Sequence, residues 1–309
     1  MKLRTEIERT PLPRPLDRGE GVLLVGSCFT DHIGQWLEES WLHVMCNPWG
    51  VLFNPASIAN SLMRVGNPSN TFILHPKSGR YYSFDHHGKW SGEDPVSLQI
   101  QLQQLDMDVK AFLARTKHII VTFGTSWVYE REGRVVANCH KFPASEFTRR
   151  RLSVDEIVTM WSQVIVQLSN SSNLSSIPSF TFTVSPIRHV KDTLHGNQLS
   201  KATLLLAIDE LQRRFPDRVQ YLPVYELLND DLRDYRFYAD DLVHPSSMAI
   251  EAVRELVMDT AMTPRLRQYM RDAEPIVRAL QHRPSDPESP QYKAFLEDTL
   301  KKKESLVNS

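Results

Sequence analysis

Five short apolar segments along the chain have the pattern of buried β-strands. They span residues 22–25, 43–46, 118–123, 180–184 and 219–222. Each is four to six residues long, and most are rich in β-branched or aromatic side chains, which favour strands. Short strands that are apolar on both faces are typical of a parallel sheet covered on both sides.

Segments with helical periodicity separate these strands. From Phe29 onwards apolar residues recur at helical spacing, so we expect a helix directly after the first strand. Ser153 followed by Glu156 is a capping box, which predicts a helix start. Two more helices are predicted over residues 199–215 and 247–257. The alternation of strands and helices predicts an α/β fold with a parallel sheet of about five strands flanked by helices.

The chain departs from this alternation in two places. Residues 51–115 form a long insertion after the second strand, and such insertions are commonly binding loops. An insertion that takes no part in binding or catalysis is an alternative of equal weight. Beyond residue 258 a polar tail punctuated by prolines predicts short helices packed across the main domain. We expect an N-terminal extension over residues 1–20, a main domain over 21–260 and a helical tail over 261–309.

Composition excludes several classes of protein. The 36 basic and 37 acidic residues leave a net charge of −1, without the basic excess of a nucleic-acid-binding surface. No stretch approaches the roughly 18 apolar residues of a membrane span, and the N-terminus lacks the apolar core of a secretory signal. Three cysteines without a Cys-x-x-Cys pair suit a reducing compartment. We therefore expect a cytoplasmic protein that binds neither nucleic acid nor membrane; its oligomeric state stays open.

Polar residues that could take part in catalysis follow the predicted strands. In an open parallel sheet, ligands bind at the carboxyl ends of the strands. The first strand ends in Gly-Ser-Cys-Phe-Thr-Asp at residues 26–31, a layout that presents a nucleophile over the free N–H groups of a helix N-terminus. After the fifth strand, Asp241 precedes His244 by three residues, as an orienting carboxylate precedes a base. Asp-x-x-His alone is a weak signal, but it becomes specific in combination with residues 26–31.

Five motifs occupy these strand ends. In chain order they are Gly-Ser-Cys-Phe at 26–29, Asn-Pro-Trp-Gly at 47–50 with Phe-Asn-Pro at 53–55, Gly-Thr-Ser-Trp-Val-Tyr-Glu at 124–130 with Asn-Cys-His-Lys at 138–141, Ser-Pro-Ile-Arg-His at 185–189, and Asp-Leu-Val-His-Pro at 241–245. From about residue 21 to 256 the chain resembles the GSCFA family, which is related to the SGNH (GDSL-like) hydrolases. That relationship implies a three-layer, flavodoxin-like sheet and a site for ester hydrolysis or acyl transfer.

The resemblance also implies which groups bind the oxyanion. In SGNH hydrolases the second block supplies a glycine N–H, which matches Gly50, and the third supplies an asparagine side chain. The third block here begins at Gly124 and has Ser126 in place of that asparagine. Asn138 or Ser126 is therefore the alternative donor, and Asn138 is preferred because a carboxamide N–H is a more fixed donor than a hydroxyl.

The same resemblance bears on the nucleophile. The Gly-Asp-Ser-x-Thr-Asp block of the relatives aligns without gaps with residues 26–31, so that Cys28 occupies the nucleophile position. Ser27 is the alternative, and chemistry does not decide between them, because Cys28 also suits a small core position. A thiol at a helix N-terminus beside an imidazole is expected to have a lowered pKa. Asp241 and His244 match the block that supplies the acid and the base.

Other polar residues at this edge complete the predicted site. His140 and His189 lie on loops there, and Arg188 is placed to meet an anionic substrate group. No metal-ligand spacing recurs, so neither a metal nor another cofactor is expected. The predicted function is an esterase-type hydrolase acting on a small-molecule or glycan ester, with acylated carbohydrates as a candidate class because aromatic residues in the insertion suit sugar stacking. The alternatives are an acyltransferase on the same site and a non-catalytic ligand-binding relative.

Overall fold

A five-stranded parallel sheet forms the centre of the structure, a computed structural model that describes residues 4–171, 174 and 176–308. In spatial order its strands are β11 (Val219–Tyr221), β10 (Ser179–Val184), β6 (Thr116–Phe123), β1 (Gly21–Gly26) and β2 (Val44–Cys46). All neighbouring pairs are parallel, so the five predicted strands and their parallel arrangement are confirmed. Numbered among themselves, they run 2-1-3-4-5, the flavodoxin-like order.

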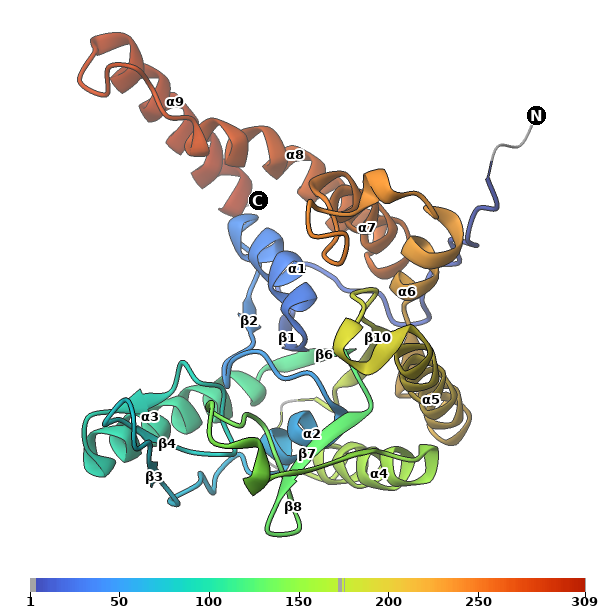
Figure 1. The fold of residues 1–309 in the computed structure, drawn as a ribbon. Coiled ribbons are helices and arrows are strands. Elements are labelled where there is room, and N and C mark those ends of the chain that lie inside the picture. Colours follow the sequence, from blue (N-terminus) through green and yellow to red (C-terminus); the bar gives the residue numbers. More distant parts are fainter. Residues whose placement is uncertain (1–3, 172–173, 175, 309) are drawn as a thin grey trace.

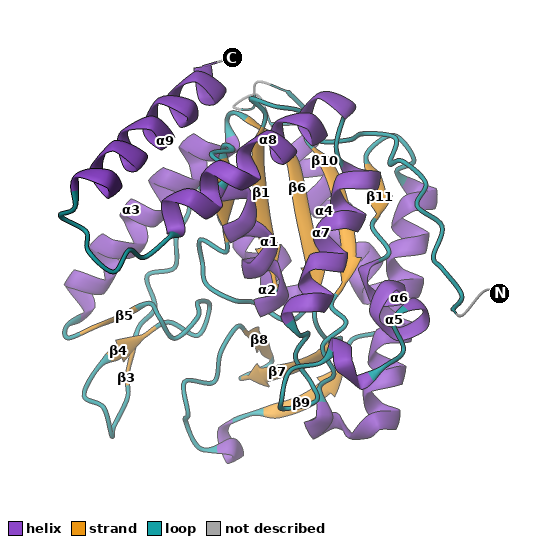
Figure 2. Cartoon of the chain, turned by 90° about the horizontal axis from the view of Figure 1, so that it is seen from above, coloured by secondary structure: helices purple, strands orange, loops and turns teal. Residues whose placement is uncertain are grey.

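Helices cover both faces of the sheet (Figures 1 and 2). Above the sheet in Figure 1 lie α1 (Cys28–Glu39), α7 (Ser247–Ala261) and α8 (Pro264–Gln281). The opposite face carries α2 (Pro55–Met63), α3 (Pro95–Leu113), α4 (Val154–Ser169) and α5 (Thr193–Arg214). Alternate side chains of β6 point to opposite faces, so Val121 joins one hydrophobic core and Ile120 the other. The predicted three-layer arrangement is therefore present.

The predicted helix starts agree with the structure except in α5. The capping box at the start of α4 is formed, because the side chains of Ser153 and Glu156 each accept a hydrogen bond from the other's backbone N–H. In contrast, α5 begins at Thr193 rather than at residue 199. Its first turn contains Gly196 and Asn197, which hide the helical pattern because both have low helix propensity.

Two small antiparallel sheets lie beyond the carboxyl ends of the parallel strands (Figure 2). The insertion contains α2, α3 and the first sheet, which consists of β3 (Ile73–Leu74), β4 (Tyr81–Tyr82) and β5 (Ser91–Gly92). The second sheet was not predicted; it consists of β8 (Arg134–Val136), β7 (Trp127–Arg131) and β9 (Thr148–Arg151). Strand β9 is Thr-Arg-Arg-Arg, a sequence without strand propensity, and its pairing with β7 is supported by an ion pair between Arg150 and Glu130.

Short helical turns complete the connections of the main domain. They are η1 (Ala144–Glu146), η2 (Val190–Asp192), α6 (Val224–Glu226), the π-helical η3 (Leu227–Asp231) and η4 (Tyr235–Phe237). None of the helices in the described ranges is both long enough and apolar enough to span a bilayer.

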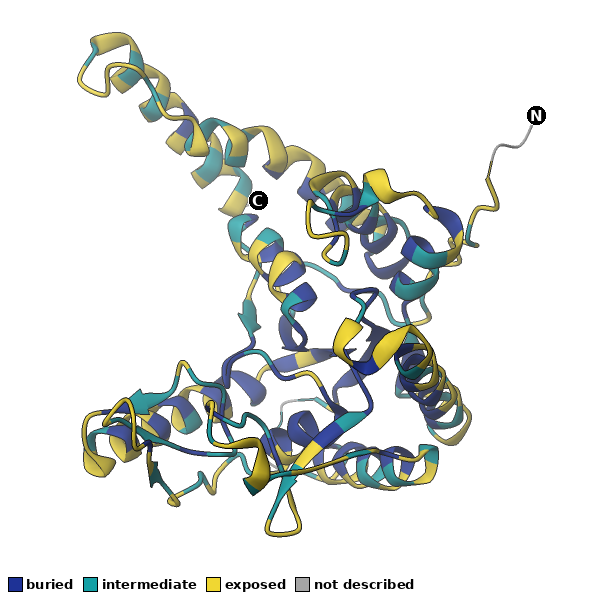
Figure 3. Ribbon diagram, viewed as in Figure 1, coloured by how far each residue is buried: buried dark blue, intermediate teal, exposed yellow. Residues whose placement is uncertain are grey.

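The C-terminal tail is a hairpin of two long helices, α8 and α9 (Pro290–Asn308). These helices have 18 and 19 residues, so the expectation of short helices is wrong. The first half of α8 packs into the core through Leu266 and Met270, whereas the hairpin tip extends away from the body and is largely exposed (Figures 1 and 3). Near its end α9 returns to the main domain, where the Lys303 ammonium lies 5.1 Å from the ring centroid of Trp41.

The turn from β1 into α1 requires glycine. Gly26 has a φ of +148°, and a Cβ at this position would lie 2.3 Å from the carbonyl oxygen of Thr122 on the neighbouring strand. The Gly26 N–H donates to Asn47 Oδ1 at 2.8 Å, and its carbonyl accepts from the Leu52 N–H at 2.9 Å. The loop after β2 therefore holds the end of β1 from both sides.

We predict that Gly26→Ala lowers the free energy of unfolding by about 2–4 kcal/mol, because it combines backbone strain with a clash against fixed backbone. Gly133→Ala is the matched control, since Gly133 also has a positive φ but has no atom near the position of a Cβ. That control should cost about 1 kcal/mol, from strain alone. Urea denaturation followed by circular dichroism measures both, and equal losses would contradict the steric argument.

Candidate active site

The candidate site lies where β1 and β6 end, at the point where the strand order reverses. Ligands of flavodoxin-like sheets bind in the crevice at this switch point. Cys28 is the first residue of α1, and Gly124 directly follows β6. The same loop holds both ends, because Leu52 N–H donates to Gly26 O at 2.9 Å and Gly124 N–H donates to Phe53 O at 2.8 Å.

Of the two candidate nucleophiles, only Cys28 is partly exposed. Ser27 is 2 % exposed, and its backbone N–H donates to Thr122 O at 3.2 Å. Its Oγ is buried without a hydrogen-bond partner in the described part of the chain. The Cys28 thiol, in contrast, is half-buried, and the backbone N–H groups of Cys28 and Phe29 favour its anionic form. A substrate can therefore reach Cys28 Sγ more readily than Ser27 Oγ.

The Cys28 thiol is not as acidic as its place in the sequence predicts. Burial raises the pKa of Cys28, and the negative charge of Asp31 raises it further. The backbone N–H groups and the charge of Lys201 act in the opposite direction but do not compensate. The expectation of a lowered pKa is therefore wrong, and the thiol needs a base to react at neutral pH.

Asp241 and His244 form a hydrogen-bonded pair on the loop before α7. His244 Nδ1 lies 2.5 Å from Asp241 Oδ2. The other carboxylate oxygen accepts the backbone N–H groups of Val243 and His244, both at 2.9 Å. Together these bonds lower the pKa of Asp241 to about 2. The carboxylate is thus ionised at neutral pH and holds the proton on Nδ1, which leaves Nε2 as the basic nitrogen.

The charge of His244 acts on α1 close to Cys28. His32 is one helical turn beyond Cys28, and the charge of His244 contributes to lowering the pKa of His32, after burial. Among the described residues, no hydrogen bond joins Cys28 Sγ or Ser27 Oγ to His244. Catalytic hydrogen bonds are commonly long in ligand-free enzymes and tighten in the substrate complex. His244 therefore acts electrostatically on the helix that begins at the thiol, and no described contact joins it to Cys28.

Gly50, the second predicted oxyanion donor, is engaged within its own loop. Its N–H donates to Asn47 O at 2.8 Å. Its φ is +86°, and a Cβ here would lie 2.3 Å from His87 Cβ. In this conformation glycine is required for the close approach of His87, and the Gly50 N–H is not free to bind a substrate.

The two candidates for the side-chain oxyanion donor differ in their accessibility. Ser126 is fully buried, and its Oγ and N–H both donate to Ser200 Oγ, at 3.1 and 2.8 Å. Asn138 uses its Oδ1 to accept the His140 N–H at 2.7 Å, while its amide N–H groups remain unused among the described contacts. No described contact brings Asn138 to Cys28. Ser126 is thus a structural residue in this fold, and Asn138 stays a prediction.

The predicted aromatic surface for sugars in the insertion takes part in packing. Trp49 is 5 % exposed, and Trp90 Nε1–H donates to Pro48 O at 3.2 Å. The ring of Tyr82 lies against His140 with centroids 4.6 Å apart. His140 is itself buried, and its Nε2–H donates to the carbonyl oxygen of Ser83 at 2.8 Å. These contacts stabilise the insertion, although Tyr82 and Trp90 stay partly exposed.

Arg188 and His189 follow β10 and take different places. Arg188 donates from Nη2 to the Tyr238 hydroxyl at 3.0 Å and lies 4.7 Å from the centre of its ring. Tyr238 forms a bridge with Pro245, so Arg188 supports the His244 loop. Burial, followed by the charge of Lys201, lowers the pKa of His189 to about 4. His189 is therefore neutral at physiological pH.

Lys201 is a site residue that the motifs do not indicate. It lies on α5, is 1 % exposed, and donates from Nζ to the carbonyl oxygens of Gly124 and Ser185, both at 2.6 Å. Burial lowers the pKa of Lys201 to about 7, against the opposing effects of Asp192 and Cys28. Its position in the sequence contains a usable signal, because it precedes the buried Leu204 by three residues and so lies on the apolar face of the helix.

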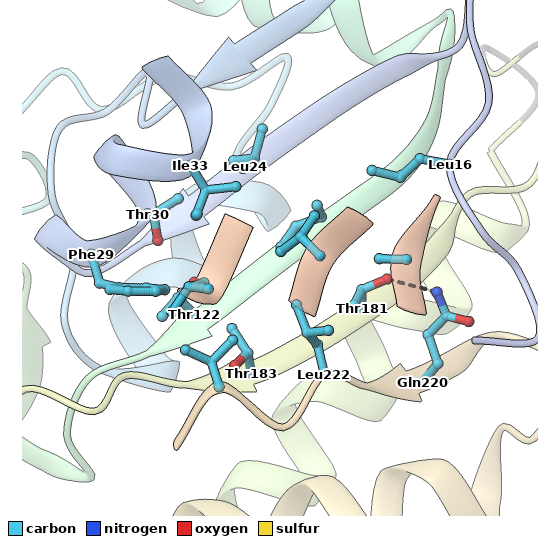
Figure 4. A pocket seen from close by; sticks show the side chains of 15 residues that line it. Leu16, Leu24, Phe29, Thr30, Ile33, Thr122, Thr181, Thr183, Gln220 and Leu222 are labelled. Atoms are coloured by element: carbon cyan, nitrogen blue, oxygen red, sulfur yellow. Dashed lines mark hydrogen bonds between the residues drawn. The ribbon is translucent and has the colours of Figure 1, made fainter. Parts of the chain in front are cut away.

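A separate internal cavity lies between the sheet and α1 (Figure 4). Apolar side chains and threonines line it, among them Leu24, Phe29, Thr122, Thr183 and Leu222. This cavity lies beneath α1, within the core, and its lining contains neither the thiol of Cys28 nor the His244 loop. In the described ranges, no group of three or more histidine, cysteine or acidic side chains is arranged to hold a metal ion.

Comparisons with known proteins give two family matches and a similar solved structure. Residues 21–256 match the family described as "GSCFA family", and residues 273–309 match "GSCFA domain protein, C-terminal domain". No curated protein matches the chain. One matching solved structure is that of a carbohydrate esterase family 2 enzyme with a carbohydrate-binding domain from Corynascus thermopiles (Myceliophthora fergusii). The two sequences are 12% identical, and the match covers 85% of this chain and 69% of the esterase chain, with a TM-score of 0.38.

We predict that Cys28 is alkylated before the other two cysteines as the pH is raised. Burial raises the pKa of Cys139 to about 11, and burial together with Asp31 raises that of Cys46 to about 12, whereas the smaller rise at Cys28 is opposed by nearby N–H groups and Lys201. Peptide-resolved mass spectrometry after brief iodoacetamide treatment between pH 7 and 10 measures the order. Reaction of Cys46 or Cys139 ahead of Cys28 would contradict this description of the site.

Proposed function

The chain belongs to the GSCFA family, and we propose that it is an esterase-type hydrolase that cleaves acyl esters through Cys28, His244 and Asp241. The observation that carries the proposal is the hydrogen bond between Asp241 and His244, 2.5 Å long, on a loop whose histidine acts electrostatically on the helix beginning at Cys28. A histidine held in one tautomer by an ionised carboxylate can remove the proton of a nucleophile that is protonated at rest.

In the proposed acylation step, His244 Nε2 takes the proton of the Cys28 thiol while Sγ attacks the ester carbonyl carbon. The oxyanion forms at the N-terminus of α1, where the backbone N–H of Cys28 and the helix dipole favour negative charge. Asp241 stabilises the imidazolium that results. His244 then gives its proton to the alcohol oxygen, the carbon–oxygen bond breaks, and a thioester to Cys28 remains.

In the proposed deacylation step, His244 accepts a proton from water, and the hydroxide attacks the thioester carbonyl. The carbon–sulfur bond breaks, the carboxylic acid leaves, and the proton returns to Cys28 Sγ. An acyltransferase would use the same steps with an acceptor hydroxyl in place of water, and a binding protein would use none. An acylated carbohydrate is a candidate substrate class through the relationship to SGNH hydrolases.

We predict that the purified protein hydrolyses 4-nitrophenyl acetate and that Cys28→Ala and His244→Ala each reduce kcat/KM by about 10²-fold or more, because general base and nucleophile act as a unit. Asp241→Asn should also lose about 10²-fold or more, since the wrong tautomer is then favoured. Ser27→Ala is the control, because the Ser27 side chain makes no hydrogen bond as the cap of α1.

The outcomes separate the candidate functions. Turnover that survives Cys28→Ala but not Ser27→Ala would assign the nucleophile to Ser27, and turnover that survives His244→Ala would exclude the proposed mechanism. Glucose pentaacetate as a second substrate tests the carbohydrate class. An acyl ester formed on added glycerol, in excess over free acid, would indicate acyl transfer, and ligand binding without turnover would indicate a non-catalytic relative.

A further inference from the structure

Lys201 carries an amino group that is buried at the candidate site and bound, in the described part of the chain, by carbonyl groups and not by a carboxylate. The side chain is 1 % exposed, and both hydrogen bonds from Nζ go to neutral carbonyl groups, those of Gly124 and Ser185, at 2.6 Å. Burying an ammonium group is unfavourable unless it is paired with an opposite charge. A lysine at this position is therefore costly compared with an apolar side chain.

The Gly124 carbonyl places this amine at the end of β6, the strand next to β1, which leads into Cys28. Gly124 is two residues beyond Thr122, and the Thr122 carbonyl accepts the N–H of Ser27, the residue before Cys28, at 3.2 Å. The two groups interact electrostatically in both directions, because Lys201 lowers the pKa of Cys28 and Cys28 raises that of Lys201. Ammonium and thiolate are thus favoured together.

We propose that Lys201 is a positioning residue for Cys28: its buried ammonium group, held by the carbonyl groups of Gly124 and Ser185, supplies the positive charge that stabilises the Cys28 thiolate. The inference rests on the proposed function for the role of Cys28 as nucleophile. An ammonium group has three N–H donors, and the two carbonyl groups use two of them. The amine is therefore fixed in position while its charge acts on the thiol.

Other charged groups also act on Cys28 and Lys201. Asp31 on α1 disfavours the Cys28 thiolate. Asp192, at the start of α5, favours the ammonium form of Lys201, and its carboxylate is itself bound by Arg149. His189 is neutral at physiological pH, because its pKa is lowered to about 4. Among the charged side chains that act on Cys28, Lys201 is the one that lowers its pKa, against burial and Asp31.

The experiment measures the rate of Cys28 alkylation by iodoacetamide against pH, resolved by peptide mass spectrometry, in the full chain. Lys201→Met removes the charge and both hydrogen bonds, whereas Lys201→Gln removes the charge and keeps a donor. We expect both variants to alkylate about tenfold more slowly than the wild type at pH 6, where Lys201 is still protonated, because one pKa unit is a factor of ten in thiolate. Cys139 in the same samples is the internal reference and should not change.

Two matched variants distinguish the effect of losing the Lys201 charge from the effect of disturbing the loop. Ser200→Ala, next to Lys201, removes hydrogen bonds to Thr125 and Ser126 without changing any charge, and its Cys28 rate should equal the wild-type rate. Asp31→Asn keeps an acceptor for Asn47 and removes a negative charge, so its Cys28 rate should rise. Rates within twofold of the wild type in both Lys201 variants, or an equal loss in Ser200→Ala, would overturn the proposal.

A second measurement applies even if neither Lys201 variant folds. The Lys201 Nζ resonance, followed by NMR in the protein labelled with ¹⁵N-lysine, should titrate at higher pH in Cys28→Asp, which puts a negative charge at position 28, than in Cys28→Ser, since coupling is reciprocal. An unchanged titration would count against the proposal. Neither measurement depends on turnover, so loss of the proposed function, seen as ester hydrolysis that survives Cys28→Ala, is distinguished from failure of this inference.

Discussion

The hydrogen bond from the Gly26 N–H to the side chain of Asn47 is the contact on which the candidate site depends. Asn47 is 4 % exposed and uses both ends of its carboxamide, since Oδ1 accepts from Gly26 and Nδ2 donates to Asp31 Oδ1 at 2.6 Å. One side chain thereby ties the end of β1, the first turn of α1 and the loop after β2. The loop continues to Phe53, whose carbonyl accepts the N–H of Gly124, so the ends of both central strands are fixed by the same segment.

This construction has an electrostatic consequence. Asp31 accepts the hydrogen bond of Asn47, and its charge, like burial, raises the pKa of Cys28. A thiolate at this place therefore requires compensation from elsewhere in the fold. Two sources act on Cys28, the N–H groups at the start of α1 and the ammonium group of Lys201 from the opposite layer. The site combines a turn that contains an acidic residue with a cation from a helix on the other face of the sheet.

The sequence predicts the fold better than it predicts the site, for a physical reason. Buried strands and capped helices depend on local apolar patterns, so the five strands and the start of α4 follow from the residues themselves. The sheet of β7, β8 and β9 does not, because pairing and ion pairs hold the arginine-rich β9 in place. Motif alignment assigns residue types but not hydrogen-bond partners. It therefore does not reveal that the Gly50 N–H is already bound to Asn47, or that Ser126 is buried against Ser200.

The Gly-Ser-Cys order of the turn can be understood from packing at each of its positions. Gly26 is required because the Thr122 carbonyl lies where its side chain would be. Ser27 is buried with extended backbone before the helix, and its N–H completes the ladder to Thr122, so a small residue is needed that does not turn outward. Cys28 is the first residue whose side chain emerges above the helix N-terminus. The geometry of the turn thus makes the third residue, and not the second, the partly exposed one, which is the reason why Cys28 and not Ser27 is available for chemistry.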